Sequence, residues 1–268
     1  MSTAWQHTTQ AERSFEAWEV QAAEVGRIIV ERRVATVFQP IRSLADGTVF
    51  GYEALSRGPA GPLNSPTALF AAAERSGLLL PLERLCRESA VRRAASFSPE
   101  LKLFLNIDPR VVNLRDFHPG VTRQLLDSVG RSASSLVLEI TERHSIEDFR
   151  SFRRALRHYT RQGYNVAIDD LGSGYSSLQA IVELKPGFLK IDRSLVRDIG
   201  RNRSKQVLVE ALTTVARRLG LRTVAEGIET AAELAAVRAL GVDYGQGYLL
   251  GRPAELPQGR EEIKCGLG

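Results

Sequence analysis

The chain has 268 residues, of which 43% are hydrophobic and 25% charged, values that are ordinary for a globular protein and exclude a disordered, collagenous or coiled-coil chain. Its 36 basic and 31 acidic residues give a net charge of +5, but the basic residues are scattered without interleaved aromatics, so no nucleic-acid polymer is predicted as a partner. No apolar run approaches the roughly 18 residues of a membrane span, and the first residues have neither the basic nor the apolar region of a signal peptide, so none is predicted. With Cys86 and Cys265 as its two cysteines, we expect a cytoplasmic protein without direct membrane insertion.

The first 33 residues are predicted to form an amphipathic helical segment. Apolar residues recur there every three or four positions, namely Phe15, Trp18, Ala22, Val25 and Ile29. This helix either packs on the following domain or continues a signalling helix from an upstream part of a longer protein. Residues 34–258 are predicted to form the main domain, and residues 259–268 a C-terminal tail.

From residue 34, short apolar runs alternate with longer helical patterns, which indicates βα units around a mainly parallel sheet. Strands are predicted over residues 35–41, 48–55, 102–107, 136–141, 165–170, 188–192, 222–226 and 244–249, and helices over 66–76, 81–95, 119–129, 145–161, 202–219 and 230–240. Eight strands in one domain predict an α/β fold, a TIM-type (β/α)8 barrel. Asp46-Gly47 is a hairpin signal between the first two strands, so the barrel is modified and its first strand runs antiparallel.

Polar side chains interrupt the strands near their carboxyl ends, where the active sites of parallel barrels lie. They are Glu53, Asn106, Glu139, Asp169, Asp170, Lys190 and Glu226, and Gln246 is expected near the start of the last strand. For any one acid, a solvent-facing residue or a structural salt bridge is the simpler explanation. One polar group on each of six strands predicts a functional site instead.

The residue types in this set indicate the chemistry. Five carboxylates and one amide oxygen, without His or Cys, suit Mg²⁺ or Mn²⁺, and two such ions can clamp the attacking and leaving oxygens of a phosphoryl displacement. Lys190 can orient or deprotonate the attacking water, although a plain salt bridge would explain this residue alone. Asn106 alone would also fit a turn. The predicted reaction is metal-assisted phosphodiester hydrolysis.

The motifs themselves resemble those of a known family. Glu53-Ala54-Leu55 is similar to the signature of the EAL-domain cyclic di-GMP phosphodiesterases. The resemblance extends in family order over residues 34–253, through Gln39-Pro40-Ile41, Asn106, Glu139-Ile-Thr-Glu142, the run from Asp169 to Ser177, Lys190-Ile-Asp192, Ala225-Glu226-Gly-Ile-Glu229 and Gln246-Gly247-Tyr248. One departure is Leu171, where the family usually has Phe, and a modest effect on loop packing is expected.

The resemblance implies hydrolysis of cyclic di-GMP to linear pGpG with two Mg²⁺ or Mn²⁺ ions, which lowers this second messenger in bacterial signalling. It implies that Glu53, Asn106, Glu139 and Asp169 hold the first metal, and that Asp169, Asp170 and Glu226 serve the second, with Glu229 close behind. Lys190 would activate the water beside the catalytic acids Glu53 and Glu226. Arg57 would contact a substrate phosphate. Gln39, Leu55, Asp192 and Gln246 would line the substrate pocket, and Glu142 would anchor the loop after Asp170, although Glu142 also fits a helix-start acid.

Partners and competing functions follow from the same resemblance. A homodimer through the loop near Gly172–Ser177 is expected, with an upstream sensor domain or a partner protein possible. The alternative function is a catalytically silent receptor that binds cyclic di-GMP and signals to a partner. A barrel that serves only as an interaction scaffold is a third reading. The complete set of acids favours the enzyme.

Overall fold

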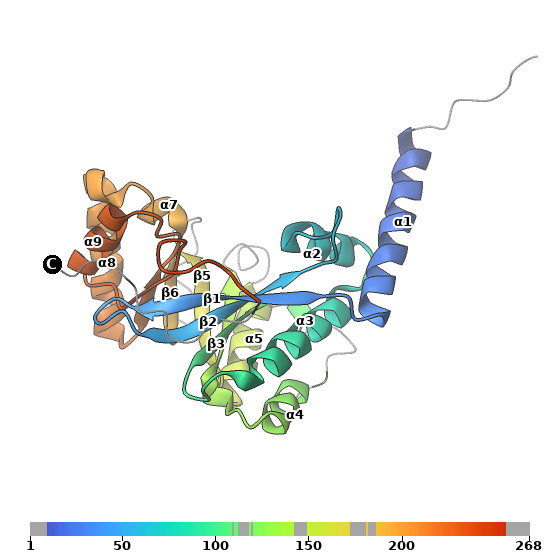
Figure 1. The fold of residues 1–268 in the computed structure, drawn as a ribbon, viewed down its shortest axis with the longest axis horizontal. Helices are drawn as coiled ribbons and strands as arrows, with labels where there is room; N and C mark the ends of the chain where they lie inside the picture. Colours follow the sequence, from blue (N-terminus) through green and yellow to red (C-terminus); the bar gives the residue numbers. More distant parts are fainter. Residues whose placement is uncertain are drawn as a thin grey trace, which may run out of the picture. The chain divides into compact units, whose positions relative to one another are not determined.

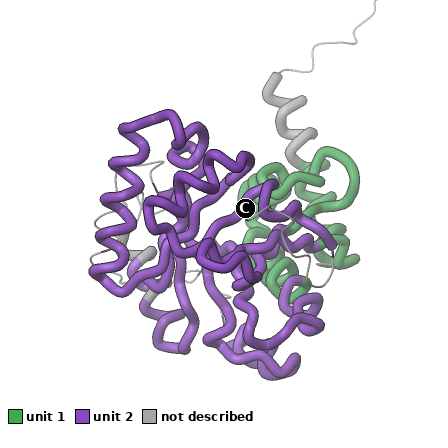
Figure 2. Tube along the Cα trace, turned by 60° about the vertical axis from the view of Figure 1, so that its left-hand side comes forward, with its two compact units in different colours: residues 1–35, 56–89 green, residues 36–55, 90–268 purple. Residues whose placement is uncertain are grey.

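A computed structural model describes residues 10–108, 110–111, 118, 120–141, 149–171, 181 and 186–255 of the chain. It divides into two compact units, shown in different colours in Figure 2. The first comprises Met1–Ala35 and Ser56–Ser89, and the second Thr36–Leu55 and Ala90–Gly268. Among the described residues, no helix is long and apolar enough to cross a membrane.

The first unit is helical and has its own small core. It contains α1 (Gln10–Val30), α2 (Pro66–Arg75) and most of α3 (Leu79–Arg93). Val25 and Ile28 of α1 pack with Leu69 of α2 and Leu82 of α3, and all four side chains are fully buried. Val25 therefore lies on the buried face that the apolar spacing predicts for this helix.

The second unit contains the closed eight-stranded barrel, which confirms the predicted fold. Its strands are β1 (Ala35–Ser43), β2 (Val49–Arg57), β3 (Lys102–Ile107), β4 (Leu136–Thr141), β5 (Asn165–Leu171), β6 (Phe188–Ile191), β7 (Arg222–Ala225) and β8 (Tyr244–Gly245). Figure 1 labels β1, β2, β3, β5 and β6. Neighbouring strands from β2 to β8 pair in parallel, whereas β1 pairs antiparallel with β8.

The reversal of β1 depends on the predicted turn between β1 and β2. Gly47 has a φ of 77°, which a residue with a Cβ rarely adopts, and its amide donates to the carbonyl of Ser43. The carboxylate of Asp46 accepts hydrogen bonds from the amide and the hydroxyl of Thr48 at 3.0 and 2.8 Å. The Asp-Gly pair thus folds the chain back within a few residues.

The helices of this unit follow the predicted order and differ by a few residues at their ends. They are α4 (Val121–Ser128), α5 (Phe149–Arg161), the short and unpredicted α7 (Arg193–Val196), α8 (Arg203–Leu219) and α9 (Ala231–Ala239). The expected strand over residues 244–249 is wrong beyond Gly245. After Gln246 the chain turns, because the amides of Leu250 and Gly251 both donate to the carbonyl of Gly247.

The barrel interior begins with an apolar layer. Phe104 and Phe188 pack edge to face there, with ring centroids 5.5 Å apart, and Phe50 stacks on Tyr244 at 4.0 Å. Other members of the layer are Ile41, Val137, Ala167 and Val224. A larger cluster that includes Leu103, Leu138 and Ile168 is formed by the alternate, outward-facing strand residues. The barrel is therefore filled by side chains at this level.

Candidate active site

A polar layer follows the apolar layer two residues further along the chain on six of the parallel strands or directly after them. On β2 the spacing differs, because Glu53 lies three positions beyond Phe50. Because alternate strand residues face the same side, each residue two positions beyond an apolar one also faces the interior. The pairs are Phe104 and Asn106, Val137 and Glu139, Ala167 and Asp169, Phe188 and Lys190, Val224 and Glu226, and Tyr244 and Gln246. On the reversed β1 the order inverts, and Gln39 precedes Ile41. The carboxyl ends of the strands therefore gather these side chains at one mouth.

Lys190 lies at the centre of the polar layer, and its side chain is only 1% exposed. Its Nζ is 2.7 Å from both Glu139 Oε1 and Glu226 Oε1 and 3.1 Å from Asp169 Oδ1. A fourth carboxylate, Glu53, has Oε2 at 3.6 Å. A buried ammonium ion requires such compensation, because removing the charge from water is costly. The structure thus brings Lys190 into contact with four of the acids that the sequence analysis predicts for the site.

Amide side chains connect the acids to one another and to β1. Asn106 Nδ2 donates to Glu53 Oε1 at 2.9 Å and to Glu139 Oε2 at 3.1 Å, so Asn106 lies on a strand and not in a turn. Gln246 Nε2 donates to Glu53 Oε2 at 2.6 Å and to Gln39 Oε1 at 3.0 Å. The expectation that Gln246 lies near the start of the last strand is wrong, because it follows the end of β8. There it lies level with the acids.

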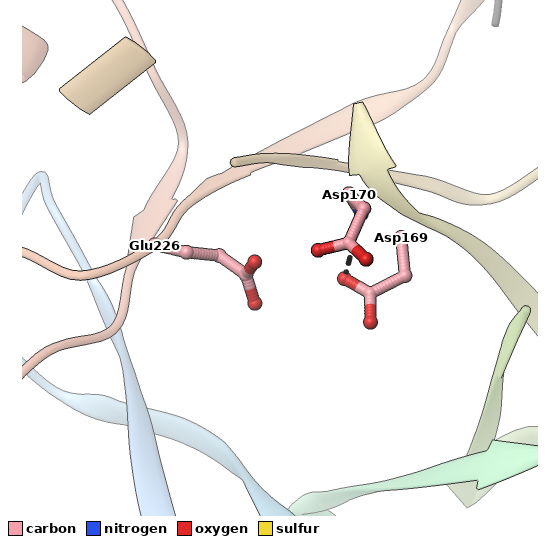
Figure 3. Close-up of side chains that lie close together, drawn as sticks. All are labelled: Asp169, Asp170 and Glu226. Atoms are coloured by element: carbon pink, nitrogen blue, oxygen red, sulfur yellow. Dashed lines mark hydrogen bonds between the residues drawn. The ribbon is translucent and has the colours of Figure 1, made fainter. Parts of the chain in front are cut away.

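Asp170 reaches the mouth through a local irregularity of β5. Strict alternation would point Asp169 inward and Asp170 outward, but the pairing of β5 with β6 shifts register between Ile168 and Leu171. Asp170 also has a φ of 59°, an unusual conformation for a residue with a side chain. Figure 3 shows the result: carboxylate oxygens of Asp169, Asp170 and Glu226 converge, and one from each lies within 4.8 Å of the others.

The electrostatics of the cluster separate the acids. Burial raises the pKa of Glu226 to about 8, against the attraction of Lys190. Burial and the nearby charge of Glu53 hold the pKa of Glu139 well above its ordinary value. Burial also acts to raise the pKa of Glu53, but Lys190 and the amides of Gln246 and Asn106 lower it below the ordinary value. Burial thus opposes ionisation of Glu139 and Glu226, whereas the neighbours of Glu53 favour its ionised form.

Lys190 itself stays protonated. Burial acts to lower its pKa, but the charges of Asp169, Glu139, Glu226 and Glu53 together raise it well above the ordinary value. As an ammonium ion, Lys190 can donate hydrogen bonds to a water or to a phosphate oxygen, and it cannot accept a proton.

The donor set fits hard divalent cations. Asp169, Asp170 and Glu226 offer three carboxylate oxygens at one point, and Glu53, Glu139 and Asn106 add carboxylate and amide oxygens beside them. Oxygen donors of this kind, without His or Cys, suit Mg²⁺ or Mn²⁺.

Some predicted site residues have other contacts. Asp192 caps the N-terminus of α7, where its Oδ1 accepts from the amide of Ser194 at 2.8 Å. Glu229 forms a 2.8 Å ion pair with Arg193 outside the acid cluster.

The other predicted site residues are placed as follows. Leu55 is half-buried on β2, and Arg57 belongs to the first unit, where its Nη1 donates to the carbonyl of Ser56. Glu142 and the loop 172–177 lie outside the described residues. Leu171 is buried in the barrel's outer core.

The sequence analysis assigns no role to the turn after β8, yet this turn adjoins the cluster. Gln39 Nε2 donates to the carbonyl of Gly251 at 3.1 Å, and Tyr248 carries an exposed ring with Arg252 Cζ 4.4 Å from its centroid. The sequence signal that could have pointed to this turn is Tyr248, the aromatic residue directly after Gln246-Gly247.

Comparison with known proteins identifies the family. The family model described as EAL domain matches residues 22–253, so the chain belongs to the EAL-domain family. It is 34% identical over 230 residues to the uncharacterized protein y4lL of Sinorhizobium fredii, covering 85% of this chain and 28% of that protein. It is 33% identical over 236 residues to the cyclic di-GMP phosphodiesterase NbdA of Pseudomonas aeruginosa, covering 85% of this chain and 30% of that protein.

Solved structures agree with the fold. The EAL enzyme Bd1971, in its cAMP- and cyclic-di-GMP-bound form, superposes with a TM-score of 0.80 at 26% identity, covering 90% of this chain and 67% of that one. The chain spans less than a third of the length of the two curated relatives described above.

Proposed function

We propose that this chain is a metal-dependent phosphodiesterase that hydrolyses cyclic di-GMP to linear pGpG. The observation that carries this proposal is the complete cluster of acids and amides around Lys190 in an EAL-domain barrel. Relatives support the substrate, because NbdA is named a cyclic di-GMP phosphodiesterase and Bd1971 binds the same nucleotide.

The oxygen donors divide between two cations in this proposal. Glu53, Asn106, Glu139 and Asp169 hold the first Mg²⁺ or Mn²⁺, and Asp169, Asp170 and Glu226 hold the second. Bound ions of this kind activate water and neutralise charge on the phosphoryl group. The backbone conformation of Asp170 matters here, because it adds a third carboxylate to the second set.

The chain's own groups position the reactants. A water oxygen attacks the phosphorus of one phosphodiester bond, the bond from phosphorus to the 3′ oxygen breaks, and that oxygen takes up a proton. Lys190 orients the attacking water by donating a hydrogen bond and offsets the negative charge that develops. Glu226, which is 2.7 Å from Lys190 Nζ, is the candidate acceptor for the water's proton.

Other parts of the proposal rest on the sequence alone. Gln39, Leu55, Arg57, Asp192 and Gln246 contact the substrate, and Glu142 and Glu229 support the site from behind. Three further expectations remain predictions. They are a homodimer through residues near 172–177, an upstream sensor domain or partner protein, and a cytoplasmic location.

The test is incubation of the purified chain with cyclic di-GMP and either Mg²⁺ or Mn²⁺, followed by chromatographic separation of the nucleotides. We expect pGpG from the wild type, none after chelation with EDTA, and a loss of orders of magnitude in Glu53→Ala and Lys190→Ala. Asp127→Ala is the control, because Asp127 pairs with exposed Arg123 on α4. Nucleotide that is bound but returned intact with either metal would establish the receptor instead.

A further inference from the structure

The turn after β8 carries an aromatic ring open to solvent and directly follows Gln246, which contacts the candidate active site. Tyr248 is 51% exposed, and among the aromatic side chains that the structure describes it alone is strongly exposed. Aromatic rings are normally buried because of their large apolar surface. An aromatic residue that remains exposed beside a site is a candidate contact for a ligand.

Backbone hydrogen bonds fix the turn that carries Tyr248. The amides of Leu250 and Gly251 donate to the carbonyl of Gly247, each at 3.0 Å, and the amide of Leu249 donates to the carbonyl of Ile228 at 3.1 Å. Tyr248 therefore lies on a turn held from within and by the segment that follows β7. A ring on such a support is preorganised for binding.

The same turn is joined at both ends to the polar layer that contains the acids. Gln246, two residues before Tyr248, donates to Glu53 Oε2 at 2.6 Å, and Gln39 donates to the carbonyl of Gly251 at 3.1 Å. The side chain of Gln246 is 95% buried, and its Oε1 has no hydrogen-bond partner among the described residues. Tyr248 is thus within a few residues, on both sides, of groups that contact the cluster.

One face of the ring is already covered by a cation. The Arg252 Cζ lies 4.4 Å from the ring centroid, which is the geometry of a cation–π contact. Tyr248 remains 51% exposed despite this contact, so part of its surface is open to a second planar group. Nucleic-acid bases bind in this way, since every base has a π face that stacks on aromatic side chains.

We propose that Tyr248, positioned by Arg252, is the stacking platform for a purine base of the nucleotide substrate. This inference rests on the proposed function, because it names the part of that substrate that the turn after β8 would recognise. Tyr248 determines specificity in this scheme and takes no part in the chemical step. The positive charge of Arg252 also favours the anionic nucleotide near the mouth.

The test compares two phosphodiesters with Mn²⁺ present: cyclic di-GMP, and bis(p-nitrophenyl) phosphate, which has no purine. In Tyr248→Ala we expect the KM for cyclic di-GMP to rise about 10- to 100-fold with a smaller change in kcat. The ratio of kcat/KM for cyclic di-GMP to that for the nitrophenyl ester should fall at least about tenfold. Tyr248→Phe, which keeps the ring, should restore the ratio, and Arg252→Ala should lower it less.

A matched control is Leu219→Ala, because Leu219 on α8 is 52% exposed and lies outside the site. Calorimetry of cyclic di-GMP binding in EDTA gives a readout independent of turnover, and Tyr248→Ala should weaken this binding. An unchanged KM in Tyr248→Ala, or an equal loss on both esters, would overturn the platform while leaving the phosphodiesterase in place. If the wild type neither binds nor cleaves cyclic di-GMP, the proposed function fails first.

Discussion

Lys190 and Glu139 form an ion pair 2.7 Å long in which the two side chains are 1% and 0% exposed. Neither charge has access to bulk water, so each depends on the other and on the remaining acids of the polar layer. The pair joins the carboxyl-terminal halves of β6 and β4 within the barrel interior. The stability of the barrel and the chemistry of its mouth therefore depend on the same groups.

Removing the ammonium ion should destabilise the metal-free protein. In Lys190→Met we expect the free energy of unfolding to fall by about 3–5 kcal/mol, because the buried carboxylates lose their common partner. Mn²⁺ should recover part of this loss, since a divalent cation compensates the same charges. Urea unfolding in EDTA and in Mn²⁺ measures both effects. Lys102→Met, which removes an exposed ammonium at Ser134, should change little, and a Lys190→Met protein as stable as wild type would refute the argument.

Metal affinity should depend on Asp169, which faces both groups of donors. We expect Asp169→Asn to weaken Mn²⁺ binding at least about tenfold, as loss of a ligand or of its support typically does. Calorimetric titration of Mn²⁺ into the chelator-treated protein gives the affinity. Asp127→Asn on α4 serves as the control, and equal affinities in the two variants would place the metal elsewhere.

Gly227 and Gly220 separate backbone strain from crowding. Both have positive φ values, 67° and 72°, but a Cβ at Gly227 would lie 2.8 Å from the Cβ of Arg193, whereas a Cβ at Gly220 meets nothing within 4 Å. Gly220→Ala should therefore cost about 1 kcal/mol, and Gly227→Ala about 3 kcal/mol. Chemical denaturation measures the difference. Because Gly227 follows Glu226, we also expect Gly227→Ala to lower turnover.

Glu233 should contribute a pH-dependent part of the stability. Its burial acts to raise its pKa, but hydrogen bonds from the amides of Glu229, Asp198 and Thr230 lower it below the ordinary value. A depressed pKa in the folded state gives stability that is present above the unfolded pKa, about 4.3, and is lost as the pH falls through the folded value. Glu233→Gln, which removes the charge and one of the two acceptor oxygens at the N-terminus of α9, should cost about 1 kcal/mol at pH 7.

The signature of this effect is its disappearance in acid. Unfolding curves of wild type and Glu233→Gln should differ at pH 7 and converge as the pH is lowered through the acid range. A difference that does not depend on pH would mean that shape, and not charge, carries the contribution of Glu233.

Much of this site could be predicted from the sequence because β-strands alternate strictly. On β3, β4 and β6, and directly after β7, a polar residue two positions beyond an apolar one had to face the same mouth. This places Asn106, Glu139, Lys190 and Glu226 together. The Asp-Gly turn likewise gave the direction of β1.

The remainder depends on features that alternation does not encode. Asp170 enters the cluster because β5 shifts register and the residue adopts a φ of 59°, and no local pattern announces either feature. The last strand ends at Gly245 because hydrogen bonds to Gly247 bend the chain, although the apolar run continues. The contacts of Asp192 and Glu229 with α7 could not be predicted because this short helix was not expected.

The apolar layer of Phe104, Phe188, Phe50 and Tyr244 restricts how molecules can enter and leave the site. These rings contact one another across the barrel. Phe104, Phe188 and Tyr244 lie two residues before the polar-layer residues Asn106, Lys190 and Gln246. Nothing the size of a nucleotide can pass between rings packed in this way. In the proposed reaction, substrate and product would therefore use the same entrance, so that a linear product still held at the mouth would block the next cyclic molecule.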